Sequence, residues 1–499
     1  MSESLISMNG MNYVNGIWVA RGDFSTLNPS TNEKLFSFPQ TTTVEIEEAV
    51  KSARQAFSSW QKISRIKRAE YFDELADLIK KNHNKLRDII SLETGKSLNE
   101  AHAEVLETLH MIQYVVGTGR QPIGNLIASE LSTKESYVIR KPKGVVAVIS
   151  PFNFCLAIGS AWTSAPAILE GNTVIHKPSE LTPMTAQLFA ELYHKAGFPK
   201  GVYNLINGNE VVGKALVKSD VDCILFTGSA DVGRSIRKHC ADTWNKSCSC
   251  EMGGKSAVIV FEDANINLAL EACMASAFKL SGQRCVSSGR FLIHRNIIDK
   301  FVKEFVYQAS KILVTDPFKV GDFNGFSYGP QISQEQLVKV VKYNDMVRND
   351  KNAKVLYDPD HSGLLTNTGN FLRPFIYQTE WRDVEYLKNE VFGPHVGFIP
   401  FDSVDQAIAI YNDTEYGLAL GVITEDFRIM RRMRDECNCG MIYLNGGSVA
   451  AESHLPFSGV KKSGYGYPSA AGTYKAVTHQ VAVTINYQED GISWAQGLK

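Results

Sequence analysis

Residues 144–176 read GVVAVISPFNFCLAIGSAWTSAPAILEGNTVIH, which is an apolar run, a helix-like stretch and a second apolar run. Further short apolar runs follow at 202–206, 222–226 and 256–261. A helix is expected at 184–196, with Pro183 at its first position and Thr182 as its cap. Short strands that alternate with helices indicate a parallel sheet with both faces covered. The sequence therefore predicts an α/β fold, with a second α/β stretch at 255–445.

The region before this stretch is predicted to be mostly helical after a short lead-in. Apolar residues recur at helical spacing in 46–60 and again in 65–81. Gly95 and Gly117 are expected to end the next two helices, because glycine readily adopts the left-handed conformation that closes a helix.

The last predicted strand is 477–487, where Val477, Val481, Val483 and Ile485 alternate with polar residues. Such alternation is typical of an antiparallel or edge strand. An edge strand can pair with another subunit or within its own chain, and the residues themselves leave both arrangements open.

Composition excludes several classes of function. The 499 residues suggest two to four domains. With 52 Lys+Arg against 53 Asp+Glu, the charge gives no case for binding nucleic acid or a membrane surface. The longest apolar runs are far shorter than the roughly 20 residues of a membrane-spanning helix. The N-terminus has no basic region before an apolar core, so no secretory signal is expected.

Nine cysteines in a chain of this length are too sparse for a disulfide scaffold. The odd count points to reduced thiols and to a cytoplasmic location. Two C-x-C pairs, Cys248/Cys250 and Cys437/Cys439, lack a second pair at zinc spacing, so both are interpreted as structural and no metal is predicted.

Two segments contain residues that suit covalent chemistry. Cys285 lies in Gly282-Gln-Arg-Cys-Val-Ser-Ser288, where Arg284 is the nearest group that favours a thiolate. Glu251 lies where a short strand ends and two glycines permit an unusual turn. Taken alone, an inert buried thiol and a turn-forming carboxylate are the simpler interpretations.

Two other segments follow predicted strands, where ligands bind in parallel α/β sheets. Asn153 has a side-chain amide that suits a developing oxyanion, although helix caps are commoner. The turn 228–233 leads into a helix expected near Val232, and its backbone amides suit a phosphate. This turn lacks the full G-x-G-x-x-G fingerprint.

Lys177 and Glu180 end another predicted strand, where they suit ribose hydroxyls or form a surface ion pair. The segment 389–394 is interpreted as a turn, unless Glu390 and Phe392 face a ligand.

These segments occur together and in order, and their combination resembles the aldehyde dehydrogenase family. The similarity extends from Tyr13-Val-Asn-Gly16 to Lys461-Lys-Ser-Gly464 and the last strand. The matching strings are PFNF, HKPSE, FTGSADVG, EMGGKS, GQRC, NEVFGP and LPFSGVKKSG. The spacing of Glu251 and Cys285 also matches the family.

The resemblance implies NAD(P)-dependent oxidation of an aldehyde, of the semialdehyde class, to a carboxylic acid through a cysteine thiohemiacetal and thioester. In this scheme Cys285 is the nucleophile, and Asn153 with the Cys285 backbone N–H binds the oxyanion. Glu251 activates the water that hydrolyses the thioester, and no metal takes part.

The resemblance also implies the cofactor contacts: Lys177 and Glu180 at the adenine ribose, Gly228, Ser229 and Gly233 at the pyrophosphate, Glu390 and Phe392 at the nicotinamide ribose. Glu180 would accept from a free 2′-hydroxyl but repel a 2′-phosphate. NAD is therefore the expected cofactor, with NADP as the alternative.

The sequence departs from the family pattern near the expected aldehyde-binding helix. Phe152 stands where Trp is common and Cys155 where Pro is common. The spacing from Asn153 to Gly171-Asn172 is one residue longer than expected. Because these changes line the path of the aldehyde, the shape of the substrate stays open, and so does the role of Cys155.

The C-terminal segment also departs from the usual pattern. Ser458 replaces a usual Gly, and residues 467–472 replace an acidic stretch. The tail is most similar to dehydrogenases of amino-acid-derived semialdehydes, of the succinylglutamate or aminoadipate type. Arg284 with Glu104 or Glu107 suits a charged substrate tail, although a structural role fits these residues equally well.

For architecture, the resemblance implies a Rossmann-like NAD(P)-binding domain at 1–120 and 143–253 and a catalytic domain at 254–450. A small β oligomerisation element would pair 121–142 with 470–499 in a homodimer or homotetramer. The alternatives are a CoA-acylating relative, which generally lacks a base like Glu251, and a non-catalytic binding protein on the same fold.

Overall fold

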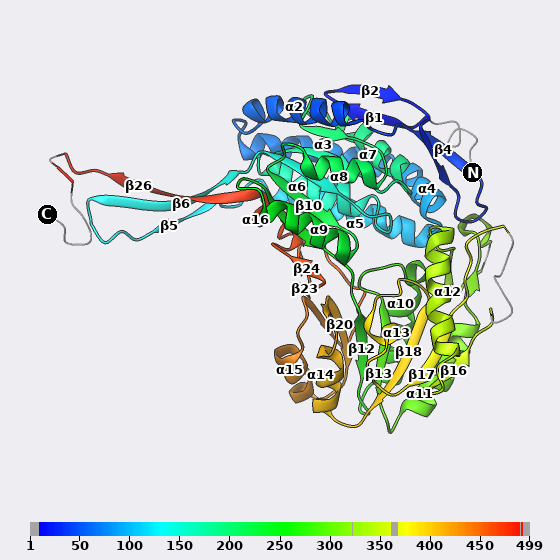
Figure 1. Cartoon of the computed structure of the whole chain (residues 1–499). Coiled ribbons are helices and arrows are strands. Elements are labelled where there is room, and N and C mark those ends of the chain that lie inside the picture. The colour runs from blue at the N-terminus through cyan, green and yellow to red at the C-terminus, as the bar shows by residue number, and fades with distance from the viewer. Residues whose placement is uncertain (1–8, 322, 361–367, 490, 493–499) are drawn as a thin grey trace.

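The computed structural model describes residues 9–321, 323–360, 368–489 and 491–492. Figure 1 shows two sheet-centred units, with a long narrow sheet that projects from the first of them. The α/β prediction is confirmed. In the described residues no helix combines the length and apolar character needed to cross a membrane.

The first sheet has eight strands in the order β2-β1-β9-β8-β7-β10-β11-β24. Their bounds are β1 (Met11–Val14), β2 (Ile17–Ala20), β7 (Val145–Ile149), β8 (Thr173–Lys177), β9 (Tyr203–Leu205), β10 (Cys223–Thr227), β11 (Ser247–Glu251) and β24 (Gly464–Tyr465). Strands β7 to β11 run parallel, and both edges are antiparallel. The four strands predicted from 144 to 226 are confirmed to within one residue at each end.

Helices cover both faces of this sheet. They are α2 (Thr43–Trp60), α3 (Arg65–Lys81), α4 (His83–Thr94), α5 (Leu98–Thr118), η1 (Ala157–Thr163), α6 (Ser164–Leu169), α7 (Pro183–Lys195), α8 (Glu210–Lys218) and α9 (Ala230–Ala241). Val145 and Ala147 of β7 pack in one cluster with α2, α8 and α9. Val146 and Val148 pack in another with α3 to α7. Because both faces are buried, β7 is apolar at every position.

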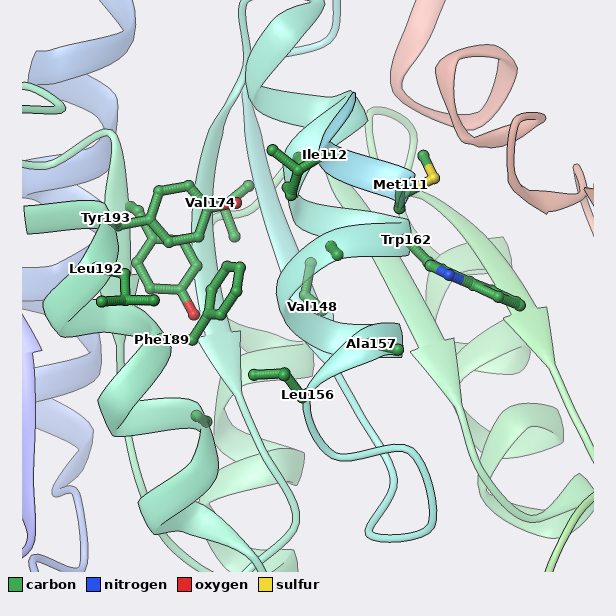
Figure 2. Close-up of a cluster of buried hydrophobic side chains, with 14 of the residues drawn as sticks. Met111, Ile112, Val148, Leu156, Ala157, Trp162, Val174, Phe189, Leu192 and Tyr193 are labelled. Carbon is green, nitrogen blue, oxygen red and sulfur yellow. The ribbon is translucent and has the colours of Figure 1, made fainter. Parts of the chain in front are cut away.

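Figure 2 shows part of the second cluster. Val148 of β7 and Val174 of β8 lie between the aromatic face of α7, with Phe189 and Tyr193, and the η1 segment. This packing fixes η1, which follows Asn153, against the body of the sheet.

The second sheet has seven strands in the order β16-β17-β18-β13-β12-β20-β21. Their bounds are β12 (Ser256–Val260), β13 (Ser288–His294), β16 (Ala353–Tyr357), β17 (Phe375–Thr379), β18 (His395–Phe401), β20 (Ala419–Ile423) and β21 (Met441–Leu444). Its helices are α10 (Ile266–Phe278), α11 (Ile298–Ser310), α12 (Gln334–Arg348), α13 (Glu385–Lys388), α14 (Val404–Asn412) and α15 (Phe427–Glu436). The chain therefore leaves the first sheet at β11, builds the second, and returns to pair β24 with β11.

The projecting sheet consists of β5 (Gly124–Ile127), β6 (Lys134–Pro142) and β26 (Thr478–Asn486). Strand β26 pairs antiparallel with β6, from Thr478 opposite Pro142 to Asn486 opposite Lys134. The predicted strand thus pairs within its own chain. It starts later than predicted, because Val477 ends the short helix α16 (Thr473–Val477) and is buried. Residues 493–499 of the predicted oligomerisation element, like residues 1–8, lie outside the described residues.

The predicted short lead-in is incomplete, because among the described residues four strands precede α2. Besides β1 and β2, these are β3 (Phe24–Leu27) and β4 (Lys34–Phe38), which pair with each other. The remaining short elements are η2 (Lys279–Gly282), β14 (Leu313–Val314), η3 (Pro317–Lys319), β15 (Ser327–Tyr328), β19 (Tyr416–Gly417), β22 (Pro456–Phe457), β23 (Val460–Lys461) and β25 (Ser469–Ala470).

Helix ends follow the prediction in part. Gly95 caps α4 with φ 73°, as predicted. The expectation for Gly117 is wrong, since α5 continues to Thr118. Helix α9 starts at Ala230, two residues before the predicted position, and the Ser229 side chain caps it by accepting from the Val232 N–H.

Thr182 precedes α7 as predicted but its side chain does not cap the helix. Instead Glu93, from α4, accepts from the backbone N–H groups of Met184 (2.8 Å) and Thr185 (2.7 Å). A carboxylate from a distant helix thus satisfies the first-turn donors, which a local sequence pattern does not reveal.

The extra residue after Asn153 has a structural counterpart. Residues Ala157–Thr163 form the π-helix η1, and α6 continues directly from it. A π-helical turn accommodates one more residue than an α-helical turn over the same length. The Thr163 hydroxyl donates to the carbonyls of Ile158 (2.8 Å) and Gly159 (3.0 Å), which stabilises the wider turn.

Candidate active site

One large cavity of about 880 Å³ lies where the carboxyl ends of the first sheet's parallel strands face the second sheet. Strand β7 ends there at Ile149, β8 at Lys177 and β11 at Glu251. Of the ten predicted site residues, nine line this cavity: Cys285, Glu251, Asn153, Lys177, Glu180, Gly228, Ser229, Glu390 and Phe392. Residues more than 200 positions apart thus meet at one sheet edge, as expected for parallel α/β folds.

Cys285 lies on the loop between η2 and β13, directly after a strained turn. Leu280, Ser281 and Gly282 all have left-handed φ values of 54°, 48° and 75°. A Cβ on Gly282 would lie 2.3 Å from the carbonyl oxygen of Gly393, so only glycine fits there. Strain of this kind is often held in place at functional sites.

The Cys285 thiol is protonated in this environment. Burial raises its pKa to about 12, and the neighbouring carboxylates of Glu390 and Glu251 act in the same direction. The backbone N–H groups of Val286 and of Cys285 itself oppose this rise. Burial raises the pKa of Tyr443 on β21 to about 12, and the neighbouring Cys285 acts in the same direction.

The two glycines after Glu251 act by allowing close approach, which corrects the predicted unusual turn. Neither Gly253 nor Gly254 has a left-handed φ. A Cβ on Gly253 would lie 2.3 Å from Glu390 Oε2, and one on Gly254 would lie 2.5 Å from the Cys285 carbonyl oxygen. The glycines therefore let the Glu390 and Cys285 loops pack against the end of β11.

Glu251 ends β11, which pairs with β10 on one side and with β24 on the other. Its carboxyl group is buried, and neither oxygen has a hydrogen-bond partner among the described residues. Burial raises its pKa well above the ordinary value, and polar groups of Ser469, Ser458 and Gly459 oppose the rise only in part. Ser458 and Ser469, two positions that depart from the family pattern, thus lie close to Glu251. The sequence alone did not indicate that they are near this carboxylate.

Two hydrogen bonds hold Asn153 in place. Its side-chain Nδ2 donates to the Gln283 carbonyl at 3.0 Å, which ties it to the cysteine loop. Its own carbonyl accepts from Lys96 Nζ at 2.8 Å. The amide group carries two N–H donors, so one remains for a ligand in the cavity.

Lys177 and Glu180 bring ionisable groups to the cavity wall. Lys177 Nζ donates to the Pro178 carbonyl at 2.8 Å and lies 3.6 Å from Glu180 Oε2. Ser229 lines the wall at the N-terminus of α9. Gly233 does not line the cavity: a Cβ there would lie 2.4 Å from Met252 Sδ, so this glycine allows α9 to pack on β11.

Glu390 and Phe392 also line the cavity. Glu390 Oε1 accepts from the Gly254 N–H at 2.9 Å, and burial raises its pKa to about 7. Phe392 has φ 63°, and its ring meets the Phe152 ring edge-on at 5.9 Å between centroids. Both rings line the cavity.

Sequence reasoning missed the helical contributions to this cavity. Helix α8 supplies Glu210, Lys214 and Lys218, and α12 supplies Gln336 and Lys339. These residues lie on ordinary helix faces without a motif, so only tertiary packing reveals them.

The sequence leaves the roles of four residues open, and the structure places them in different environments. Cys155 is in the second core cluster, with Val146 and Val148, and not in the cavity, and burial raises its pKa well above the ordinary value. Arg284 lies over the Phe154 ring at 5.0 Å and 3.9 Å from Glu100. Glu104 pairs with Lys96. Burial raises the Glu107 pKa to about 7.

All nine cysteines are described and none is in a disulfide. Among the described residues, no group of three or more histidine, cysteine or acidic side chains is arranged to hold a metal.

The doubly covered parallel sheet, with its ligand-sized cavity between two units, is typical of a dinucleotide-dependent oxidoreductase. Residues 18–483 match the Aldehyde dehydrogenase family, and the chain belongs to that family. It is therefore an oxidoreductase of the aldehyde dehydrogenase class.

Several relatives act on semialdehydes by name. The chain is 31% identical over 459 residues to an alpha-ketoglutaric semialdehyde dehydrogenase of Bacillus subtilis, covering 91% of this chain and 93% of that protein. It is 34% identical over 470 residues to the mitochondrial succinate-semialdehyde dehydrogenase of Rattus norvegicus, covering 92% of this chain and 87% of that protein.

A solved structure confirms the fold. Betaine aldehyde dehydrogenase of Staphylococcus aureus in complex with NAD+ superposes with a TM-score of 0.91 at 29% identity, covering 99% of this chain and 98% of that chain.

Proposed function

We propose that this protein oxidises an aldehyde, of the semialdehyde class, to a carboxylic acid with NAD as the hydride acceptor. The observation that carries the proposal is the convergence of Cys285, Glu251 and Asn153 in the wall of a single cavity. The semialdehyde assignment draws on the names of the relatives.

The first half of the reaction uses the thiol. The Cys285 thiol releases its proton to solvent water, and the sulfur attacks the aldehyde carbon, which forms a thiohemiacetal oxyanion. The free N–H of Asn153 and the Cys285 backbone N–H donate to the resulting oxyanion. When held in the cavity, NAD would supply the acceptor for the hydride that leaves this carbon. An acyl thioester on Cys285 is then left.

The second half uses water. Glu251 accepts a proton from a water molecule as the oxygen attacks the thioester carbon. The C–S bond breaks, Cys285 regains a thiol, and the carboxylic acid is released. A buried carboxylate with a raised pKa is a stronger base than an exposed one, which suits this step.

The hydrolytic route is favoured over acyl transfer to CoA because Glu251 provides a base for water. Measuring NAD reduction with a panel of semialdehydes, each with and without CoA, tests the proposal. A carboxylic acid product that needs no CoA is expected. An acyl-CoA product would identify the acylating relative, and absence of NAD reduction with every aldehyde would favour a binding protein.

The cavity has groups that fit NAD. Lys177 and Glu180 would hold the adenine ribose, the α9 N-terminus with Gly228 and Ser229 the pyrophosphate, and Glu390 the nicotinamide ribose. Gly233 would act by keeping α9 close to β11 and not by direct contact. NAD is preferred over NADP because Glu180 would repel a 2′-phosphate.

Replacing Glu180 with Gln is expected to shift the cofactor preference. Removing a carboxylate beside the 2′ position lowers KM for NADP relative to NAD by roughly tenfold, about 1.4 kcal/mol. Steady-state kinetics with both cofactors measure the shift. Glu210→Gln, which removes the same charge elsewhere on the cavity wall, is the matched control. Equal shifts in both variants would refute a specific role for Glu180.

We further propose that residues 1–120 and 143–253 form the cofactor-binding domain, 254–450 the catalytic domain, and 121–142 with 470–499 an oligomerisation element. The projecting sheet supports this, because β5 and β26 are its edge strands and β5 exposes Leu126 and Ile127. Edge strands with exposed apolar residues favour pairing with a second copy, in a homodimer or homotetramer.

Replacing Leu126 and Ile127 together with Asp is expected to reduce the oligomer to smaller species, because two charges at a β edge oppose pairing. Light scattering after gel filtration measures the mass. Val44→Asp, a similarly exposed apolar position on α2, should leave it unchanged. An unaltered mass in the Leu126/Ile127 variant would exclude this edge as the interface.

We also propose a reducing, cytoplasmic location, because the mechanism requires Cys285 as a free thiol and the other eight cysteines are also free.

A further inference from the structure

We propose that Lys96 and Glu104 are positioning residues for Asn153. Their buried ion pair fixes the orientation of the Asn153 side-chain N–H that donates to the oxyanion. The inference rests on the proposed function. Neither residue lines the cavity, and both are almost fully buried, at 2% and 1% exposure. Lys96 Nζ lies 2.5 Å from Glu104 Oε2.

Lys96 holds the amino-terminal side of residues 153–157, the segment that begins with Asn153. It follows Gly95, whose left-handed turn ends α4 and directs the chain toward the β7 loop. Besides the ion pair, its Nζ donates to the Asn153 carbonyl at 2.8 Å and lies 4.7 Å from the centre of the Phe154 ring. The ammonium thus contacts the backbone of the residue that carries the oxyanion donor.

Glu104 holds the carboxyl-terminal side. Its Oε1 accepts from the backbone N–H of Leu156 at 2.8 Å and of Ala157 at 3.2 Å. These are the first amides of η1, where a carboxylate is stabilised by the helix dipole. The ion pair therefore binds both ends of 153–157.

This arrangement leaves the Asn153 amide little freedom. Its main chain is fixed by Lys96 and Glu104, and one N–H of its side chain donates to Gln283. The direction of the second N–H is then determined. Oxyanion donors act only within a narrow range of distance, so a small displacement of this segment lowers the rate of attack.

Stability alone does not account for the pair. A buried ion pair loses so much hydration that apolar residues of similar volume often stabilise a core equally well or better. What apolar residues cannot supply is a donor to the Asn153 carbonyl together with an acceptor for two η1 amides. The charges thus define the geometry of the segment.

The test compares Lys96→Met and Glu104→Gln in the wild-type and Asn153→Ala backgrounds. In the wild-type background, which retains Asn153, each substitution is expected to lower the rate of the first turnover, followed as a burst of NADH, by roughly 10- to 100-fold. NAD affinity and the rate of Cys285 alkylation should stay unchanged. In the Asn153→Ala background neither substitution should lower the burst rate further, because the donor on which they act is gone.

Glu170→Gln is the matched control. Glu170 follows α6, at the far end of the same helical segment, and pairs with Arg65 at 2.8 Å. This variant disturbs a largely buried ion pair at the far end of that segment but should keep the burst rate. Thermal unfolding verifies that each variant is folded, and Glu104→Gln, which keeps one oxygen for the η1 amides, serves if Lys96→Met does not fold.

Two results would overturn the inference: an unchanged burst rate in folded variants, or a further loss in the Asn153→Ala background. Failure of the proposed function gives a different result. If Asn153→Ala alone leaves the burst rate intact, Asn153 is not the oxyanion donor and the proposed reaction itself is in error.

Discussion

Replacing Cys285 with Ala is expected to abolish oxidation of every aldehyde, with kcat reduced by at least roughly 10⁴-fold. The remaining groups of the cavity bind substrate and cofactor but offer no other nucleophile at this position. NAD reduction with an aldehyde panel measures the loss, and equilibrium titration with NAD verifies that the cofactor site is intact.

The suitable control is Cys439→Ala, because Cys439 is half-buried like Cys285 but lies in the second unit away from the cavity. This variant should keep its activity. Substantial oxidation by Cys285→Ala would remove Cys285 from its proposed role, whatever the control shows.

The raised pKa of Cys285 predicts how the rate of attack on the aldehyde changes with pH. Because burial raises the Cys285 pKa to about 12, only a small fraction is thiolate near neutral pH. Deprotonation becomes easier as pH rises, so attack on the aldehyde should accelerate toward alkaline pH. Alkylation of the free enzyme should follow the same trend.

Replacing Glu251 with Gln is expected to separate the two halves of the reaction. The amide cannot accept a proton from water, so hydrolysis of the thioester slows by roughly 10²- to 10⁴-fold. Formation of the thioester does not use this base. Rapid mixing should therefore show a burst of NADH close to one per active site, followed by very slow turnover.

The pH profile provides a second measurement for Glu251. Only the deprotonated carboxylate is a base, and its pKa is raised, so hydrolysis in the natural protein increases as pH rises through that pKa. Glu251→Gln should lose this increase. Glu93→Gln, another buried carboxylate that caps α7, should keep both the profile and the turnover. Unchanged steady-state turnover in Glu251→Gln would contradict its role as the base.

The sequence predicts the fold well wherever burial on both faces leaves continuous apolar runs, as at β7 and β8. It also predicts the residues at strand ends, because topology alone brings Asn153, Lys177 and Glu251 to one edge. It fails where a contact joins distant segments. The capping of α7 by Glu93, the packing role of Gly233 and the cavity wall from α8 have no local pattern. The glycines after Glu251 were predicted for the right place but for the wrong physical reason.

The pairing of β24 with β11 has a consequence for how the protein folds. Tyr465 lies opposite Cys250 and Gly464 opposite Glu251, with the entire second sheet in the chain between them. Contacts between residues so distant in sequence form late, because closing a long loop costs entropy before the contact is gained. The ribosome also delivers β24 only after nearly all of the second unit has been synthesised. The surroundings of Glu251 are therefore completed near the end of folding, so partly folded chains lack a finished hydrolytic site.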